Sequence, residues 1–187
     1  MDDIKAQLID VAQTLIQKLG YNGFSYRDIS AIVGIRNASI HYHFPTKADL
    51  GAAVAASYRE RFMERLASAK EDETDTYNLL SFYASLFKEA LDQDNRMCLC
   101  GMLSAEVSSL PDLVAVEAKR FLEENLDWLS RQFAIHANNG DGRLSEGPET
   151  EAALYMASLQ GALILAKGLG DTGIFDRIAE AALGRYR

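Results

Sequence analysis

The sequence is poor in residues that interrupt helices. It has 187 residues but only three prolines, and none of them falls inside a long periodic segment. No alternation of apolar and polar residues of comparable length predicts a strand. Because 48% of the residues are hydrophobic, the chain can bury a substantial core. We therefore expect an all-α protein.

Cysteine is also scarce. Cys98 and Cys100 are the two cysteines, and their spacing does not build a disulfide framework. In the run RMCLCGM, residues 96–102, the simplest expectation for Cys98 is a small buried hydrophobic side chain. A reactive thiol at Cys98, helped by Arg96, is the alternative that stays open.

Targeting and membrane-spanning signals are absent as well. The chain starts with an acidic Met-Asp-Asp sequence, so we expect no signal peptide. The most apolar run, residues 152–166, is shorter than the ~20 residues that cross a bilayer, and it contains Tyr155, Ser158 and Gln160. The expectation is a buried helix in a cytoplasmic protein without a membrane partner.

Motifs for catalysis or metal binding are missing too. No nucleophile elbow, phosphate loop, zinc-protease motif or carboxylate pair stands out. His41 and His43 are two apart on a predicted helix, so they point in different directions, and no acidic or thiol ligand has matching spacing. The NGDG loop of residues 139–142 fails as a calcium loop, because Ala137 and Pro148 would take its first and twelfth ligand positions. We expect no enzymatic activity, cofactor or metal.

Acidic residues outnumber basic ones, but unevenly. The net charge is −8, yet residues 1–47 carry five Lys/Arg against four Asp/Glu. The excess of acid lies in residues 48–187. Overall charge therefore does not exclude nucleic acid as a partner of the first 47 residues.

The stretch SYRDISAIVGIRNASIHYHFPTK, residues 25–47, contains the clearest signals of the chain. Ser25 and Asp28 have the spacing of a capping box that opens a helix, in which Ile29, Ile32 and Val33 form the apolar stripe. Gly34 suits the left-handed conformation that ends it. A second helix follows from Ile35, with Ile40 and Phe44 as its apolar residues.

Pro45 ends this second helix, since it disfavours helical geometry at Phe44. Thr46 and Asp49 then repeat the capping spacing and open a third helix. Apolar residues of a preceding helix, from Ile4 to Leu19, recur at helical spacing and provide the surface on which the two short helices pack. The expectation is a helix-turn-helix head over residues 1–47.

At these residues the chain resembles the TetR family of bacterial transcriptional regulators. The matching positions are Ser25, Asp28-Ile29-Ser30, Gly34-Ile35, Ile40-His41-Tyr42-His43-Phe44, Thr46-Lys47 and Leu50. Arg36 departs from the family pattern, which usually has a serine or threonine cap there, and His41 replaces a usual tyrosine. Asn37 is a candidate to take over the capping.

In a helix-turn-helix the second helix enters the major groove of double-stranded DNA, and its side chains meet base edges. Arg36, Asn37 and Ser39 are the candidate base contacts, because arginine suits guanine and asparagine suits adenine. The resemblance implies phosphate contacts from Tyr42, His43 and Lys47. The further predicted DNA contacts are Ser25, Arg27, His41 and Thr46, of which Ser25 and Thr46 lie at helix starts that favour anions.

Residues 48–187 are expected to form a helical domain for effector binding and dimerisation. Helices are predicted over residues 46–69, 76–93, 95–108, 111–138, 149–169 and 174–186. The resemblance implies a pocket for a small apolar or aromatic effector among them. The candidate ligand residues are Tyr58, Phe62, Phe82, Tyr83, Phe87, Cys98, Met102, Trp128 and Met156, although each alone is more often core.

A homodimer through the C-terminal helices is also expected. Ala153, Ala157 and Gly161 form a flat strip at four-residue steps, which permits close approach of another helix. The seam of Leu122, Leu126, Leu129 and Phe133 is its predicted companion.

Together these features predict a ligand-responsive transcriptional regulator, a repressor that an effector releases from a palindromic operator. A thiol-reactive sensor acting through Cys98 is one alternative. The alternative of another class is a helical enzyme or interaction protein that does not bind DNA.

Overall fold

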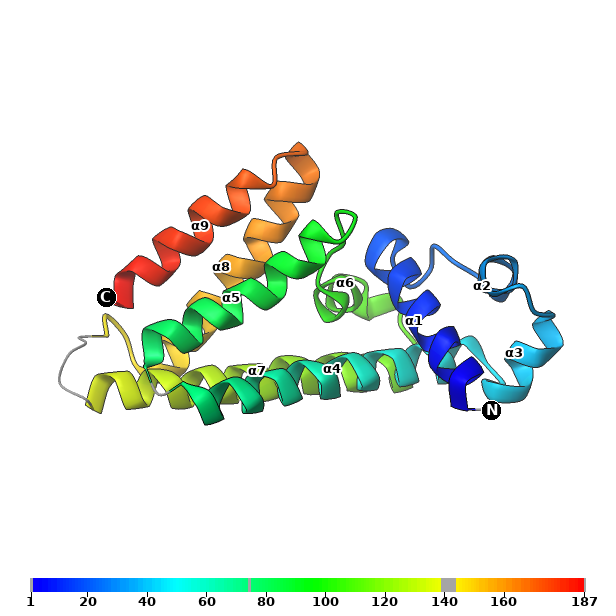
Figure 1. Ribbon diagram of the computed structural model, residues 1–187, viewed down its shortest axis with the longest axis horizontal. Coiled ribbons are helices and arrows are strands. Elements are labelled where there is room, and N and C mark those ends of the chain that lie inside the picture. Colours follow the sequence, from blue (N-terminus) through cyan, green and yellow to red (C-terminus); the bar gives the residue numbers. More distant parts are fainter. Residues whose placement is uncertain (1, 74, 139–143, 187) are drawn as a thin grey trace. The chain divides into compact units, whose positions relative to one another are not determined.

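The computed structural model describes residues 2–73, 75–138 and 144–186 (Figure 1). Every regular element in these ranges is a helix and none is a strand, as the sequence predicts. The chain divides into two compact units. Unit 1 comprises the described residues of Met1–Arg61 and Leu99–Phe121, and unit 2 those of Phe62–Cys98 and Leu122–Arg187.

Unit 1 contains the predicted helix-turn-helix. Its complete helices are α1 (Asp2–Leu19), α2 (Tyr26–Val33), α3 (Asn37–His43), α6 (Leu99–Ala105) and the 3-10 turn η1 (Val107–Ser109). Two long helices, α4 (Lys47–Asp72) and α7 (Asp112–Asn138), begin in unit 1 and end in unit 2.

The core of unit 1 is larger than a three-helix head. Leu8, Ile16, Ile29 and Ile40 from the first three helices are completely buried. The same apolar cluster includes residues of α4, α6 and α7, among them Leu50, Val54, Leu99, Leu103, Val114 and Ala118. The first three helices therefore do not close their core alone, and a functional boundary at residue 47 stays a prediction.

Local signals set the ends of the short helices. Gly34 ends α2 in the left-handed conformation, with φ of 77°. Phe44, before Pro45, leaves helical geometry and ends α3. The predicted stripe of α2 was wrong in one residue, since Ile32 is 60% exposed. Tyr26 is buried instead, because it lies one turn before Ile29 on the face that meets the core.

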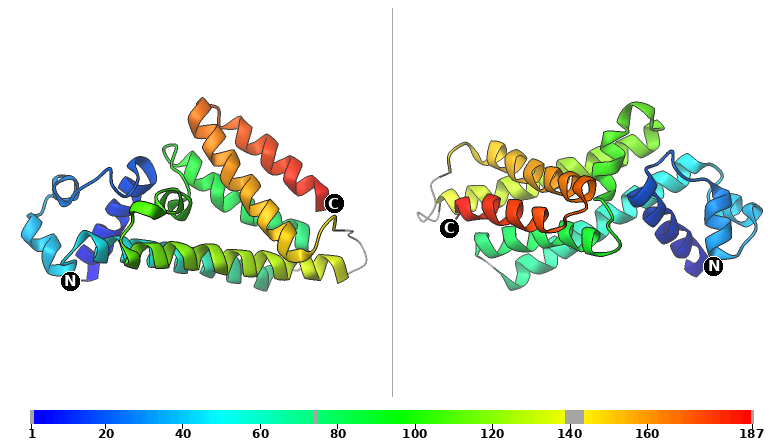
Figure 2. Two further views of the ribbon diagram at one scale, coloured as in Figure 1. Left: turned by 180° about the vertical axis from the view of Figure 1, so that it is seen from behind. Right: turned by 90° about the horizontal axis from the view of Figure 1, so that it is seen from above.

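Unit 2 is built from the second halves of α4 and α7 together with three further helices. These are α5 (Thr76–Asp92), α8 (Pro148–Leu169) and α9 (Gly173–Leu183), which continues into the 3-10 turn η2 (Gly184–Tyr186). The helices α8 and α9 lie side by side and antiparallel, and α5 packs against both (Figures 1 and 2).

The helix predicted over residues 95–108 begins later than expected. Asp94 and Asn95 have positive φ values of 69° and 56°, and the Arg96 N–H donates to the carbonyl oxygen of Ala90 at 3.0 Å. This is a capping arrangement at the end of α5, so residues 96–98 are not helical and α6 starts only at Leu99. The calcium loop that the sequence argues against, residues 139–142, lies outside the described residues.

Two expectations about apolar helices need correction. The apolar run of residues 152–166 belongs to a longer helix, α8, which among the described residues is alone in being long and apolar enough to cross a membrane. Its 18-residue window has a mean hydropathy of 1.3 and is 39% buried. In the predicted dimer seam, Leu129 and Phe133 are completely buried within the protomer, and the Phe133 ring meets that of Tyr155 at 6.1 Å.

Candidate nucleic-acid interface and effector site

Two capping boxes open the helices on either side of α3. The hydroxyl and the N–H of Ser25 both lie 2.7 Å from Asp28 Oδ2, and these bonds lower the pKa of the Asp28 carboxyl. Thr46 Oγ1 and N lie 2.7 and 2.9 Å from Asp49 Oδ2. Both hydroxyl protons are thus committed to a carboxylate, with which a DNA phosphate would compete.

The helix α3 presents most of its surface to solvent. Ile40 is its one buried residue, and the predicted base contacts Arg36, Asn37 and Ser39 are all exposed at its start. Arg36 is the N-cap residue, with φ of −75° and ψ of 147°, and no side chain caps the helix. The expectation that Asn37 caps α3 was therefore wrong, because Asn37 already lies inside the first turn.

The ring side chains at the end of α3 lie at the surface of unit 1, where His41 and Tyr42 are exposed and His43 is half-buried. Tyr42 is 75% exposed and its ring meets the His43 ring edge-on at 5.2 Å. His41 Nδ1 lies 3.1 Å from the carbonyl oxygen of Pro45, and its ring lies 4.8 Å from that of Tyr26. His41 therefore contacts the turn that follows α3.

A cleft beside α3 adds to this surface. Its volume is about 440 Å³ and it is lined by Ile4, Ile35, Ala38, Ser39, Tyr42 and His43. Three of the predicted DNA contacts thus share one concave face with the start of α1. Of the other predicted contacts, Arg27 is exposed on α2.

Tyr26 is a positioning residue that the sequence patterns did not reveal. Its hydroxyl lies 2.9 Å from the carbonyl oxygen of Phe44 and 2.6 Å from that of Thr46, so its proton is shared between the two sides of Pro45. Burial, and to a lesser extent Asp49 and Tyr21, raise the pKa of Tyr26 to about 12. The available signal was its position one turn before Ile29.

Lys47 is held inside unit 1 rather than free at a helix start. Its Nζ donates to the carbonyl oxygen of Phe24 at 2.6 Å and lies 4.6 and 4.3 Å from the ring centroids of Tyr21 and Phe24. Burial lowers the pKa of Lys47, while Glu106 and Asp28 oppose that shift. The predicted phosphate contact thus competes with an internal role.

Glu106, between α6 and η1, is the second residue that the sequence patterns missed. Its Oε2 accepts hydrogen bonds from the Tyr21 N–H at 3.0 Å and from Asn22 Nδ2 at 3.4 Å. Asn22 Nδ2 also donates to Ser109 Oγ at 3.1 Å. The end of α6 is therefore bonded to the turn that joins α1 to α2.

Several predicted ligand residues meet in an aromatic cluster of unit 2. The completely buried ring of Tyr83 stacks on Trp128 at 5.7 Å and contacts the rings of Phe62 and Phe87 at 5.8 and 5.2 Å. Tyr155, which the sequence patterns did not single out, adds a fifth ring at 6.2 Å. This cluster brings together four of the nine candidates.

The other candidates are placed differently. Tyr58 and Met102 belong to unit 1, where Tyr58 packs on Phe121 at 5.5 Å. The half-buried ring of Phe82 lies 5.9 Å from the Arg65 guanidinium. Met156 is buried in unit 2.

The two cysteines are not bonded to each other. Neither Cys98 nor Cys100 forms a disulfide, and both are almost completely inaccessible. Burial in apolar surroundings disfavours the thiolate that a reactive cysteine needs. Within the ranges that the structure describes, no group of three or more His, Cys, Asp or Glu residues gathers as a metal site would require.

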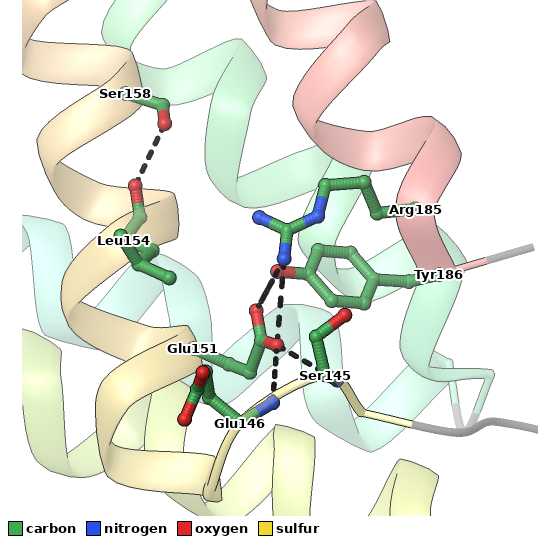
Figure 3. Close-up of polar contacts among 7 residues, drawn as sticks. All are labelled: Ser145, Glu146, Glu151, Leu154, Ser158, Arg185 and Tyr186. Atoms are coloured by element: carbon green, nitrogen blue, oxygen red, sulfur yellow. Dashed lines mark hydrogen bonds and ion pairs between the residues drawn. The ribbon is translucent and has the colours of Figure 1, made fainter.

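A completely buried carboxylate fastens the C-terminal end of unit 2 (Figure 3). Glu151 Oε1 accepts from the N–H groups of Ser145 and Glu146 at 3.1 and 3.0 Å, and Oε2 accepts from the Tyr186 hydroxyl at 2.7 Å. Arg185 lies 3.3 Å from Oε2. Glu151 thus bonds η2 to the start of α8 and to the residues before it.

The exposed helix α3 follows α2 after a short turn, and capping boxes hold the starts of α2 and α4 on either side of it. This is the architecture of a helix-turn-helix DNA-binding protein, in which α3 is the second helix of the motif. Residues 8–54 match the family model of bacterial regulatory proteins of the tetR family. The crystal structure of a TetR-family transcriptional regulator from Agrobacterium tumefaciens is similar, with a TM-score of 0.94 and 32% identity over 98% of this chain and 97% of that chain.

Two curated relatives are similar in sequence. The HTH-type transcriptional repressor DhaR of Mycobacterium sp. (strain GP1) is 25% identical over 88% of this chain and 82% of its own length. The negative transcriptional regulator IcaR of the biofilm operon icaADBC in Staphylococcus epidermidis is 31% identical over 65% of this chain and 62% of its own length.

The chain belongs to the TetR family of bacterial transcriptional regulators. It is a ligand-responsive, DNA-binding regulator, and its partners are operator DNA and a second copy of itself. The structure and these comparisons do not favour the thiol-sensor and non-DNA-binding alternatives.

Proposed function

We propose that this protein is a cytoplasmic repressor that binds a palindromic operator as a homodimer and leaves it when a small apolar or aromatic effector binds in unit 2. The exposed start of α3, with Arg36, Asn37 and Ser39 on one helical turn, is the observation that carries the DNA-binding part. The names of DhaR and IcaR, a repressor and a negative regulator, support repression. The absence of enzymatic activity stays a prediction.

Dimerisation is proposed to use α8. Several large apolar residues of this helix are exposed, namely Leu154, Ile164, Leu165 and Leu169. The small residues Ala153 and Ala157 are also exposed on it. A second copy that covers this face would bury apolar surface at roughly 25 cal/mol per Å².

The geometry of DNA favours a two-fold symmetric operator. Two α3 helices must lie about one DNA turn, roughly 34 Å, apart to enter successive major grooves of one face. An effector that binds more tightly to a dimer whose α3 helices have another separation lowers the affinity for DNA. The difference between the effector's binding free energies for the two forms sets the size of this decrease. The predicted contacts Ser25, Arg27, His41, Tyr42, His43, Thr46 and Lys47 would set register on the phosphates.

In vitro selection of bound DNA from a random library tests this proposal. Arg36→Ala should weaken binding to the selected operator by about 1–3 kcal/mol, and should relax the preference at one base pair in each half-site. Lys70→Ala, an exposed cation outside unit 1, is the matched control and should leave base preference unchanged. A folded dimer that enriches no sequence would refute DNA binding as the function.

A further inference from the structure

The hydroxyl of Tyr83 differs from those of three other buried tyrosines, Tyr26, Tyr155 and Tyr186. Tyr155 donates to the carbonyl oxygen of Leu80 at 2.9 Å, Tyr186 donates to Glu151, and Tyr26 donates within the head. Tyr83 is completely buried, yet its hydroxyl has no hydrogen-bond partner among the described residues. Since buried polar groups are normally paired, its partner is expected to come from outside the protein.

A second unpaired group lies on the helix against which Tyr83 stacks. Gln132 is 1% exposed, and its Nε2 donates to the carbonyl oxygen of Trp128 at 3.4 Å, one turn earlier on α7. Its Oε1 has no hydrogen-bond partner in the described part of the chain. Trp128 and Gln132 are four residues apart, so their side chains leave α7 on the same face.

The surroundings of these two groups are aromatic. The Tyr83 and Trp128 rings are nearly parallel, with an interplanar angle of 13°, and Phe62 and Phe87 flank Tyr83. Such rings favour stacking or edge contact with another planar ring. A ligand that binds among these rings gains the most binding free energy if its body is aromatic and its polar part is small.

The same surroundings favour an uncharged ligand. Burial raises the pKa of Tyr83 well above its ordinary value, and the Cys98 thiol and Tyr155 hydroxyl raise it further. A nearby cation would lower it, and among the described residues none acts on Tyr83 in this way. Arg96 Nε is also buried without a hydrogen-bond partner, but Arg96 does not contribute to this shift. A carboxylate ligand would lose its hydration on entering these buried, aromatic surroundings.

We propose that Tyr83, Trp128 and Gln132 recognise an uncharged, planar aromatic effector that carries a hydroxyl group, a phenol in chemical class. A hydroxyl is both acceptor and donor, so it can accept from the Tyr83 hydroxyl and donate to Gln132 Oε1. This assignment rests on the proposed function only in naming the ligand an effector. The site itself is tested without DNA.

Trp128 is the single tryptophan of the chain, so its fluorescence reports directly on this site. We suggest titrating the dimer of the 187-residue chain with 4-ethylphenol, ethylbenzene and 4-ethylbenzoate, and measuring affinity by calorimetry in parallel. The expected order is 4-ethylphenol first, with at least about tenfold weaker binding of the other two. Tighter binding of 4-ethylbenzoate, or no binding of any probe, would overturn the proposal.

Three substitutions assign the hydrogen bonds. Tyr83→Phe and Gln132→Met each keep the side-chain volume. Each should weaken the affinity for 4-ethylphenol about tenfold and change the affinity for ethylbenzene less than about twofold. Because Tyr83→Phe removes an unpaired hydroxyl, it should not lower the stability of the ligand-free protein. Tyr155→Phe is the matched control: it removes a paired hydroxyl, so it should lower stability but keep the ratio of the two affinities.

An unchanged ratio in both Tyr83→Phe and Gln132→Met would show that these groups bind only a buried water, and would refute the site. The proposed function is measured separately, as release of the selected operator. Probe binding without operator release would support the site and count against the effector role. Operator binding that no probe affects, together with no fluorescence change, would leave the DNA-binding function standing and overturn the phenol assignment.

Discussion

The Nζ of Lys47 donates a hydrogen bond of 2.6 Å to the carbonyl oxygen of Phe24. The first residue of α4 is thereby joined to the residue that precedes the α2 capping box. The Phe24 and Tyr21 rings lie close to the same ammonium group, at 4.3 and 4.6 Å. Lys47 thus connects the start of α4 to the residue before the α2 capping box, at the two ends of the helix-turn-helix.

Lys47→Ala should separate its internal role from the predicted phosphate contact. Loss of the hydrogen bond and of the two cation–π contacts should lower stability by about 1–2 kcal/mol. If Lys47 also neutralises a phosphate, the slope of log K against log salt should fall by roughly one unit. Thermal unfolding and operator titration at several salt concentrations measure both. Lower stability with an unchanged slope would confine Lys47 to the internal role.

Glu106→Ala should loosen the turn between α1 and α2. It leaves the Tyr21 N–H and Asn22 Nδ2 without their carboxylate acceptor, at a cost of about 1–3 kcal/mol. Hydrogen exchange at the Tyr21 amide should become faster. Ser109→Ala removes the bond from Asn22 and the bond from the Ser109 hydroxyl to the Glu106 carbonyl oxygen, but it keeps the Glu106 carboxylate, so it should leave that amide protected. Equal protection of Tyr21 in wild type and Glu106→Ala would contradict the assignment.

The pKa of Tyr26 predicts how unit 1 responds to alkali. Its folded pKa of about 12 lies above the ordinary value of 10.0, so the folded state holds this proton more tightly than the unfolded state. The stability that Tyr26 contributes is complete below pH 10 and should be lost as the pH rises from 10 to 12. Unfolding followed across this range should show a smaller decline in Tyr26→Phe. An identical decline in both proteins would exclude Tyr26 as the cause.

Glu151→Gln should destabilise unit 2 although it preserves side-chain volume. An amide presents one oxygen where the carboxylate presents two, and its NH₂ group would face donors that now bind Glu151. Breaking such a buried charged network costs about 3 kcal/mol. Urea unfolding measures the loss. In a double-mutant cycle with Tyr186→Phe, the two changes should not be additive, whereas additivity would show that the pair acts independently.

Gly161→Leu tests the proposed dimer face. A Cβ at Gly161 meets nothing within 4 Å in the protomer, so the larger side chain should be tolerated in an isolated chain. It should nevertheless prevent close approach of a second α8. Light scattering should then report a particle near 20.7 kDa instead of twice that mass. Ala67→Leu, on an exposed part of α4, is the control, and a dimeric Gly161→Leu protein would move the interface elsewhere.

The sequence predicted best the features that depend on neighbours along the chain. Ser25 with Asp28, and Thr46 with Asp49, are three residues apart, and both pairs form the expected capping bonds. The positions of Asp94 and Asn95 show the limit of such signals. Their left-handed conformation extends the cap of α5 and delays α6, although the apolar spacing favoured an earlier helix start.

Site residues were harder to predict where their partners are distant. Aromatic spacing selected Tyr83 and Trp128, but spacing alone could not separate them from Phe82, which is only half-buried. Likewise, Leu129 and Phe133 fit an apolar seam equally well on either side of α7. Only packing shows that both lie in the protomer core, where they cannot face a second copy.

By itself, the sequence determined the helices, most of their ends and the helix-turn-helix, because caps, glycine and proline act within one turn. Tertiary structure decided which side chains hold that motif in place. Tyr26 meets Phe44 across 18 positions, and Glu106 meets Tyr21 across 85. Contacts at such separations depend on how helices pack, and no local pattern encodes them. For that reason the sequence did not reveal that Lys47, a predicted DNA contact, also bonds to Phe24 inside unit 1.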